Sequence, residues 1–236
     1  MLSRSRVSNS TRLISWLGRL SPPSRESAFQ CSDDVYDIKI CRDSIICGLR
    51  NGTIEIWNRN TLTKEMELSE QQGEVQVEAN DDIVVGVSTD STVCIWERSS
   101  GKIKGKQRRL NIDKHQLPNR RDRHFSDVFF HHRASVYGVA LLPDGSVATG
   151  SMDGTISVID GATLTVKKHF LAHDEGGWGV SDLEASAADN ALYSGSLSGH
   201  IRSWSLPTCS LVLDIDAGHA VNCISVHGGV IASCSR

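Results

Sequence analysis

The side chains best able to do chemistry in this sequence are its nine histidines, its carboxylates and its seven cysteines. His131, His132, His173 and Asp174 stand out first, because a histidine beside a carboxylate is a common general base. No recognisable nucleophile or phosphate loop accompanies them, since the sequence contains no G-x-S-x-G, G-x-x-x-x-G-K-[ST] or H-E-x-x-H motif. We therefore predict no catalytic residue and no enzymatic activity.

The cysteines and glycines give no sign of a metal or cofactor site. The cysteines include no C-x-x-C pair, and several lie in apolar runs such as I-I-C-G-L, which is typical of buried reduced thiols. A structural zinc site would need ligands clustered about two to four residues apart. The glycines of H-D-E-G-G-W-G, residues 173–179, are spaced as a turn and not as a dinucleotide-binding loop. We predict neither a metal ion nor a cofactor.

The sequence offers better candidates for binding than for catalysis, and the first is a basic segment in the middle of the chain. The net charge is only -3, yet residues 98–124 carry ten basic side chains against two acidic ones. Because arginine pairs with phosphate or carboxylate through two hydrogen bonds, we predict that Lys114, Arg120, Arg121 and Arg123 contact an acidic or phosphorylated protein segment. Nucleic acid is a weaker alternative, since few aromatic side chains lie nearby for base stacking. A solvated loop without a partner is the other interpretation.

Trp178 is a second candidate for contact with a partner. It lies in the glycine-rich stretch at residues 173–179, outside any repeated position. Exposed tryptophans are over-represented among the residues that dominate protein interfaces. The alternative is a structural tryptophan that covers the end of a neighbouring strand.

The first 27 residues form a separate basic segment. Residues 1–25 contain five arginines and no acidic residue, with apolar residues at helical spacing between Leu13 and Leu20. This composition is that of a mitochondrial presequence. A short amphipathic helix, or a tail that ends at Pro22-Pro23, is the favoured interpretation.

The elements that must position these groups come from a repeat. Four segments share an apolar strand, a turn of polar residues and a second alternating strand, and they end at Trp57, Trp96, Ile159 and Trp204. A short turn of this kind between two apolar runs predicts a β-hairpin. Because a further strand-like run precedes each hairpin and another follows it, each unit predicts four short antiparallel strands. Such units, recurring about every 40 residues, predict the blades of a β-propeller.

At these residues the sequence resembles the WD-repeat family, whose units begin with Gly-His and end with Trp-Asp. The hairpins G-S-M-D-G-T-I-S-V-I and G-S-L-S-G-H-I-R-S-W carry the resemblance. The resemblance implies an all-β WD-repeat propeller with four complete blades and half of a fifth, in units similar to those of F-box and WD-type proteins. The predicted blades span about 33–68, 74–108, 134–170 and 178–215, and the fifth begins near Val221.

The resemblance also implies a buried hydrogen-bonded network in each blade, made by a histidine before the first strand, an aspartate in the hairpin turn and the tryptophan. The matching positions are Trp57, Asp90, Trp96, Asp153, His173, Trp204 and His219. No blade keeps the whole set, since Asn51 and Ser198 replace the aspartate, Ile159 replaces the tryptophan, and no histidine is evident before Asp90. We expect lower rigidity wherever a member is missing.

The domain boundaries follow from the repeat. Residues 1–27 precede the propeller as a tail or short helix, and residues 28–236 form the propeller arc with a basic insertion at about 102–132. The insertion explains the 63-residue spacing between Trp96 and Ile159. Because a seven-bladed ring needs roughly 290 residues at about 42 residues per blade, we expect this chain to be a fragment that ends inside its fifth blade.

The resemblance implies a non-enzymatic scaffold that binds peptide or protein partners on the propeller face within a larger complex. Alternatives are a substrate-recognition subunit of a ubiquitin ligase and a nucleic-acid or ribosome-associated propeller that uses the basic segment. An enzyme with a site in the central channel is the weakest alternative, because the carboxylates fall mostly in turns or at solvent-facing positions. No apolar run is long enough to predict a membrane span. We expect a cytoplasmic location, with the nucleus and the mitochondrion as alternatives.

Overall fold

The computed structural model describes residues 28–107, 132–174 and 178–235, and every helix or strand assigned in these ranges is a β-strand. The strands form four sheets of four strands and one sheet of two, each ordered along the chain. Their bounds are β1 Val35–Cys41, β2 Ser44–Leu49, β3 Thr53–Asn58, β4 Lys64–Ser69, β5 Val75–Ala79, β6 Ile83–Ser88, β7 Val93–Glu97, β8 Ile103–Gln107, β9 Val136–Leu141, β10 Val147–Ser151, β11 Thr155–Ile159, β12 Val166–Leu171, β13 Val180–Ser186, β14 Ala191–Ser196, β15 His200–Ser205, β16 Leu211–Asp216, β17 Cys223–His227 and β18 Val230–Cys234. In the described ranges, no helix is long and apolar enough to cross a membrane.

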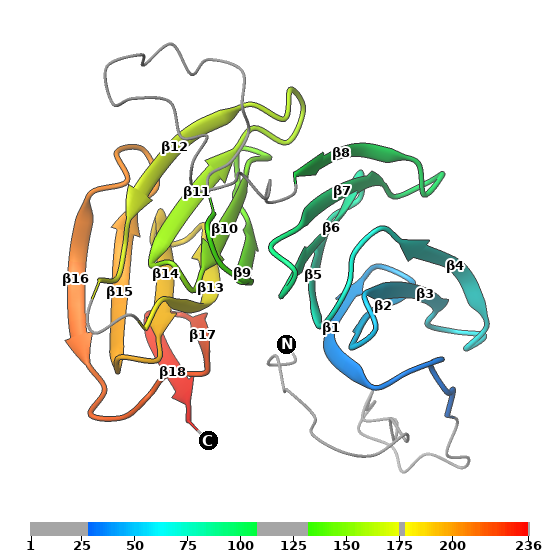
Figure 1. The fold of residues 1–236 in the computed structure, drawn as a ribbon, viewed down its shortest axis with the longest axis horizontal. Helices are drawn as coiled ribbons and strands as arrows, with labels where there is room; N and C mark the ends of the chain where they lie inside the picture. Colours follow the sequence, from blue (N-terminus) through cyan, green and yellow to red (C-terminus); the bar gives the residue numbers. More distant parts are fainter. Residues whose placement is uncertain (1–27, 108–131, 175–177, 236) are drawn as a thin grey trace, which may run out of the picture.

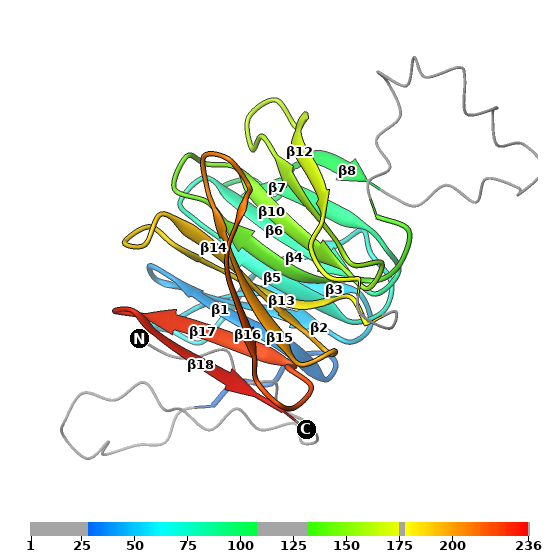
Figure 2. The same ribbon diagram turned by 90° about the vertical axis from the view of Figure 1, so that its left-hand side faces the viewer.

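The first strand of each sheet lies innermost in the molecule. Neighbouring first strands contact one another in the series β1, β5, β9, β13 and β17. Figure 1 shows the sheets following one another around an arc, with β4, β8, β12 and β16 toward the outside. Figure 2 brings the β16 side forward and shows the other sheets stacked behind it. This is the arrangement of propeller blades, so the predicted all-β propeller is confirmed.

The predicted blade limits agree closely with the sheets. The four complete sheets span residues 35–69, 75–107, 136–171 and 180–216, and the fifth sheet contains β17 and β18. The repeat could predict these limits because alternation and turns are both local signals. The predicted N-terminal segment at residues 1–27 lies outside the described residues, as does most of the basic insertion.

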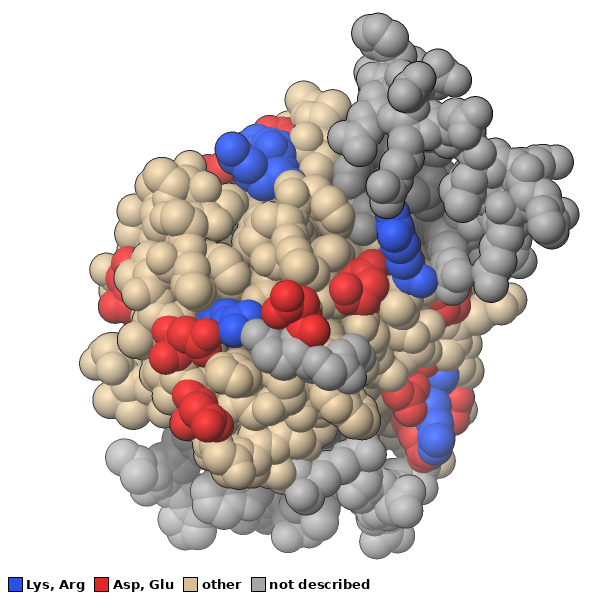
Figure 3. Space-filling view, turned by 60° about the vertical axis from the view of Figure 1, so that its left-hand side comes forward, with Lys and Arg blue, Asp and Glu red and all other residues tan. Residues whose placement is uncertain are grey.

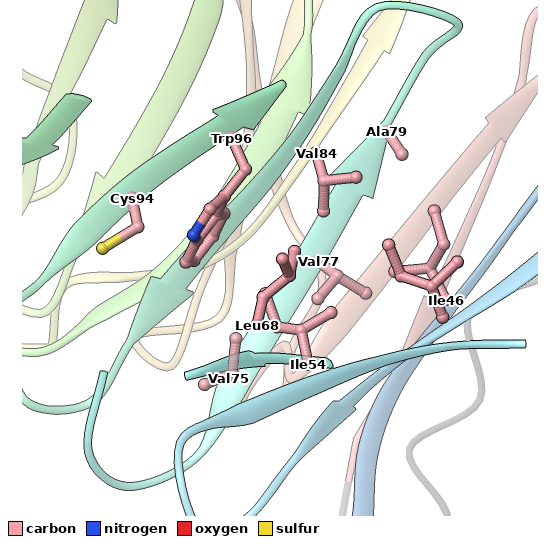
Figure 4. Close-up of a cluster of buried hydrophobic side chains, with 10 residues drawn as sticks. Ile46, Ile54, Leu68, Val75, Val77, Ala79, Val84, Cys94 and Trp96 are labelled. Carbon is pink, nitrogen blue, oxygen red and sulfur yellow. The ribbon is translucent and has the colours of Figure 1, made fainter. Parts of the chain in front are cut away.

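The core lies between the sheets and is built from side chains that alternate along each strand. Between the first and second sheets, Ile46 and Ile54 pack against Val77, Val84 and Trp96 (Figure 4). Comparable buried clusters lie between each later pair of neighbouring sheets. Burying one such aliphatic side chain contributes about 1.5–3 kcal/mol. Face-to-face burial therefore holds each blade to the next.

The outer edge of every complete sheet carries a β-bulge at the same place. The ladder between the third and fourth strands shifts next to Trp57, Trp96, Ile159 and Trp204. In each case one residue of the fourth strand has no opposite partner. A bulge increases the local twist and turns the side chain of the extra residue away from the regular ladder.

Gly154 in the third hairpin turn allows this blade to touch the following connection. Its φ is 85°, and a Cβ atom added there would lie 1.9 Å from the main-chain oxygen of His173. Only glycine combines this backbone conformation with such a close approach. This close contact fixes the segment that carries His173, which leads to the fourth sheet.

The prediction that the cysteines are reduced thiols is wrong for one pair. Cys223 on β17 and Cys234 on β18 lie opposite each other, with Cα atoms 5.2 Å apart, and form a disulfide. The remaining five cysteines are free. Spacing alone could not show this pairing, because the two residues meet only once the hairpin sets the strand register.

Candidate functional site

Trp178 lies in the connection from β12 to β13, and it is 54% exposed. Its main chain is nevertheless held in place, because the Ser196 hydroxyl donates a hydrogen bond to the Trp178 carbonyl oxygen at 2.9 Å. The next residue, Gly179, lies so close to Met152 that an added Cβ atom would be 2.4 Å from the Met152 main chain. The indole ring is therefore exposed to solvent while the main chain that carries it is held in place.

The predicted basic contacts Lys114, Arg120, Arg121 and Arg123 lie outside the described residues. They belong to the segment that joins β8 to β9. This segment connects an outer strand to the next inner strand, as does the connection that carries Trp178. The contact roles of these residues stay a prediction.

A buried network holds the Trp178 connection onto the fourth sheet. Nε2 of His173 lies 2.8 Å from Oγ of Ser194, and Trp204 Nε1 donates to the same hydroxyl oxygen at 2.9 Å. Ser194, which the sequence analysis did not single out, joins the histidine to the tryptophan. Ser198, at the turn position where aspartate was expected, bonds instead to the neighbouring Ser196 hydroxyl at 2.8 Å.

The third sheet has a related network that includes Asp153. Nε2 of His132 lies 2.7 Å from Thr149 Oγ1, and its Nδ1 lies 3.0 Å from Thr155 Oγ1. The Thr155 hydroxyl and main-chain N–H donate to Asp153 Oδ1 at 2.6 and 3.0 Å, and the Arg133 N–H donates to Oδ2. Burial raises the pKa of the Asp153 carboxyl, but the nearby His132 ring and the hydrogen bonds from Arg133 and Thr155 outweigh burial and hold that pKa below its usual range.

The low pKa of Asp153 predicts an acid-dependent loss of stability. A depressed pKa contributes stability above about pH 4, the ordinary pKa of an aspartate, and the contribution is lost as the pH falls toward the folded-state pKa. Between pH 6 and pH 3, we expect wild type to lose about 1 kcal/mol more unfolding free energy than Asp153→Asn. Denaturant melts at each pH would measure this difference. Asn at the exposed Asp82 is the control, and an equal loss in both Asn variants would contradict the prediction.

The second sheet places a glutamine where the other networks have a histidine. Gln71 is buried, and its Nε2 donates to the carbonyl oxygens of Gly86 and Thr92 at 3.0 and 2.9 Å. The next residue, Gln72, donates its N–H to Asp90 Oδ2 at 2.9 Å. The missing histidine before Asp90 was expected from the sequence, but its replacement by Gln71 was not. The signal that could have found it is a polar residue four positions before the first strand residue.

The first sheet replaces the network with sulfur and a carboxylate. A hydrogen bond to the Cys31 thiol, together with burial, raises the pKa of Cys47. Trp57 Nε1 donates to Glu55 Oε2 at 3.0 Å, and Lys64 Nζ lies 3.3 Å from Glu55 Oε1. A buried thiol with a raised pKa is a poor nucleophile at neutral pH. These residues hold the sheet together and provide no reactive group.

The repeat role of His219 stays a prediction. His219 is exposed, and its Nδ1 lies 3.3 Å from the neighbouring Ala220 carbonyl oxygen. The Ala217 N–H donates to the Gly199 carbonyl oxygen, as the residue before His173 does in the preceding unit. A Cβ atom added at Gly199 would nevertheless lie nearest the His219 main-chain oxygen, as one added at Gly154 would lie nearest that of His173. His219 also lies four residues before Cys223, the first residue of β17, as His132 lies four residues before Val136. The described fifth sheet contains β17 and β18 and offers no third strand with which His219 could form the network.

Two buried aspartates that the sequence analysis did not single out join neighbouring blades. Asp37 Oδ2 accepts the Val77 N–H at 2.9 Å, and Asp182 Oδ2 accepts the Ile224 N–H at 2.9 Å. In both cases Oδ1 accepts the N–H of the next residue in its own strand, also at 2.9 Å. The available signal was an aspartate two residues after the valine that begins an inner strand. A buried carboxylate is stable there because main-chain donors satisfy it.

The inner strands also line a small hollow of about 220 Å³. Its lining includes Lys39, Glu78, Asn80 and Glu184, which come from three different sheets. Lys39 Nζ pairs with Glu78 Oε1 at 2.7 Å. In the part of the chain that the structure describes, no three His, Cys, Asp or Glu side chains gather as metal ligands. The hollow presents an ion pair and no nucleophile, so it supports no particular reaction.

Comparison with known families and structures supports the architecture. Residues 124–160 match the family described as "WD domain, G-beta repeat". A chain in a solved structure, "Crystal Structure of Mitotic Checkpoint Complex", is similar with a TM-score of 0.67 and 19% sequence identity. The alignment covers 85% of this chain and 59% of that chain, so this chain spans less than two thirds of the length of the one it matches. At this identity the likeness concerns the fold alone.

Sequence comparison with curated proteins found no match. By contrast, 1450 chains in solved structures share the fold. A fold this widespread is compatible with many functions, so the function must be inferred from the residues outside the repeat.

Proposed function

Because this chain is built of WD repeats folded as propeller blades, we propose that it is a non-enzymatic scaffold that binds segments of partner proteins. The proposed binding face is formed by the connections from each outer strand to the next inner strand. Trp178 lies on this face, and its exposed ring on an anchored backbone is the observation that carries the proposal.

The Trp178 indole ring is unusually exposed, so a partner can gain binding energy by covering it. Of the tryptophans among the described residues, Trp57 is half-buried and Trp96 and Trp204 are buried. Covering the Trp178 ring with an apolar partner group would remove a large apolar surface from water. Because Ser196 already holds the Trp178 main chain, binding would cost little backbone ordering there.

Charge supplies the second part of the proposal. The segment between β8 and β9 contains Lys114, Arg120, Arg121 and Arg123, and we propose that they attract an acidic or phosphorylated partner segment. Exposed charges of this kind accelerate association and are screened by salt. Binding through both contacts should therefore weaken as the salt concentration rises, while the contribution of Trp178 persists.

Trp178→Ala tests the proposed face directly. A tryptophan at the centre of an interface contributes about 2 kcal/mol or more, so we expect partner affinity to fall about 30-fold. Stability should change by no more than about 0.5 kcal/mol, because the ring is exposed. Partners captured by the tagged full chain would be identified and quantified by mass spectrometry, and thermal melts would report stability.

The matched control is Trp57→Phe, which alters a tryptophan of the first sheet, away from the proposed face. Equal partner recovery by wild type and Trp178→Ala would overturn the proposed face. Charge reversal at Arg120 and Arg121 tests the basic contacts separately, and an unchanged salt dependence would remove them from the proposal.

A nucleic-acid role is the second candidate, and the basic composition of residues 98–124 is the observation in its favour. Capture with and without nuclease separates the two functions. Loss of all partners on nuclease treatment would favour nucleic acid, whereas partners that resist nuclease but dissociate at high salt would favour the scaffold. Because the similar solved chain is part of a complex, we also propose that this protein acts within an assembly, in the cytoplasm.

A further inference from the structure

The four outer strands differ at the bulge that they share. The bulged residue without an opposite partner is Glu65 in β4, Lys104 in β8, Lys167 in β12 and Val212 in β16. All four residues are exposed. The first three sheets therefore place a charge at this position, and the fourth places a valine.

The difference matters because an outer strand is a free sheet edge. A charged side chain on an edge strand discourages pairing with another chain, and an exposed apolar edge permits it. In β16, Leu211, Val212 and Leu213 are consecutive and 49%, 66% and 43% exposed. Figure 3, which turns this side of the molecule forward, shows wide uncharged areas between isolated charged groups. We call Leu211–Asp216 the β16 edge.

The register gives the β16 edge two chemically different sides. Asp214 pairs with Arg202 across the ladder and Asp216 pairs with His200, so both carboxylates share one side of the sheet. Asp214 accepts from Arg202 Nε at 2.9 Å and contacts His200 Nδ1 at 2.8 Å. Two carboxylates therefore share this side with one guanidinium.

The other side of the edge is apolar. Leu213 and Ile215 alternate with the two aspartates and project toward the fifth sheet, where Ile215 joins the buried cluster around Ile224. A strand added beside β16 would place alternate side chains next to each of these two rows.

We propose that the β16 edge binds an extended segment of a partner protein that alternates basic and apolar residues, by adding it as a fifth strand to the fourth sheet. The basic side chains lie beside Asp214 and Asp216, and the apolar ones lie beside Leu213 and Ile215. Main-chain hydrogen bonds supply affinity and the alternating side chains supply selectivity. This surface is separate from the proposed Trp178 face and does not depend on it.

A second copy of this chain is a poorer occupant. Pairing two β16 edges antiparallel would bring Asp214 and Asp216 of both copies onto one short ladder. Like charges on neighbouring strands are destabilising. Charge therefore favours a basic partner segment over self-association.

The probe for this proposal is a cyclised β-hairpin peptide with one strand of sequence Lys-Val-Lys-Val-Lys, because a preformed strand avoids the entropy loss of ordering. We expect it to bind the full chain and to slow amide exchange in β16. Val212→Lys, which restores the charge found in the other outer strands, should weaken binding at least fivefold. A peptide with Glu in place of Lys should bind at least tenfold more weakly.

Lys104→Ala is the matched control, because it changes the same bulge position in the second sheet. It should leave peptide binding unchanged, and thermal melts should show that both variants fold as wild type does. Three results would each overturn the proposal: equal affinity for Val212→Lys, slowed exchange in another strand, or a dimer of the free chain that Val212→Lys dissolves.

Discussion

Asp182→Ala is expected to lower the free energy of unfolding by about 3–5 kcal/mol. Asp182 is 1% exposed, and its carboxylate accepts main-chain N–H groups from Leu183 and Ile224. Removing it leaves the buried Ile224 N–H without this acceptor and takes one acceptor from the Leu183 N–H, and each such loss costs about 1–3 kcal/mol. The Ile224 bond also links β13 to β17, so the fifth sheet should loosen first. Denaturant melts would give the loss, and amide exchange at Ile224 would show where it occurs.

The exposed Asp82 provides a matched control. Asp82→Ala should change stability by no more than about 0.5 kcal/mol, since it removes the same group from the surface. Asp182→Asn should lie between wild type and Asp182→Ala, because an amide retains one acceptor oxygen. Unchanged exchange at Ile224 in Asp182→Ala would show that this carboxylate does not join the two blades.

Trp204→Ala should have a comparable effect by a different route. The ring is buried between the third and fourth sheets, with its centroid 5.0 Å from that of Phe170, and its Nε1 donates to Ser194 Oγ. Replacing a buried aromatic residue with alanine leaves a cavity and costs about 3–5 kcal/mol. The loss should appear as a lower denaturation midpoint with an unchanged denaturant slope.

Trp178→Ala is the natural comparison, since it removes the same side chain from an exposed position next to the same sheet. It should leave the midpoint nearly unchanged while reducing partner binding. A double-mutant cycle between His173 and Trp204 would further measure their coupling through Ser194. Purely additive effects of His173→Ala and Trp204→Phe would show that the network does not act as a unit.

The fold could be predicted from the sequence because its signals are local. Alternating apolar residues and hairpin turns predict strands wherever they occur, and the repeat of these signals predicts blades. Trp178 could be singled out in the same way, since it lies in a connection and at no repeated position. Its exposure could not be predicted, because it depends on the contacts of Ser196 with the Trp178 main chain and of Met152 with Gly179, which are tertiary contacts.

The buried hydrogen-bonded networks of the blades could not be predicted in full from local sequence patterns. A glutamine at position 71 and a cysteine at position 31 replace the histidine found in the third and fourth blades. Their replacement roles appear only when the blade brings the connection against its own second and third strands.

By itself, the sequence determined the strand order, the blade limits and the basic segments, because periodicity, turn chemistry and charge are readable along the chain. Only the tertiary structure decided that Asp37 and Asp182 join successive blades and that Cys223 pairs with Cys234. It alone also decided that Val212 leaves the bulge of one outer strand without a charge. Each of these depends on strand register, and register is set by contacts between residues that are distant in the sequence or brought together only by the hairpin.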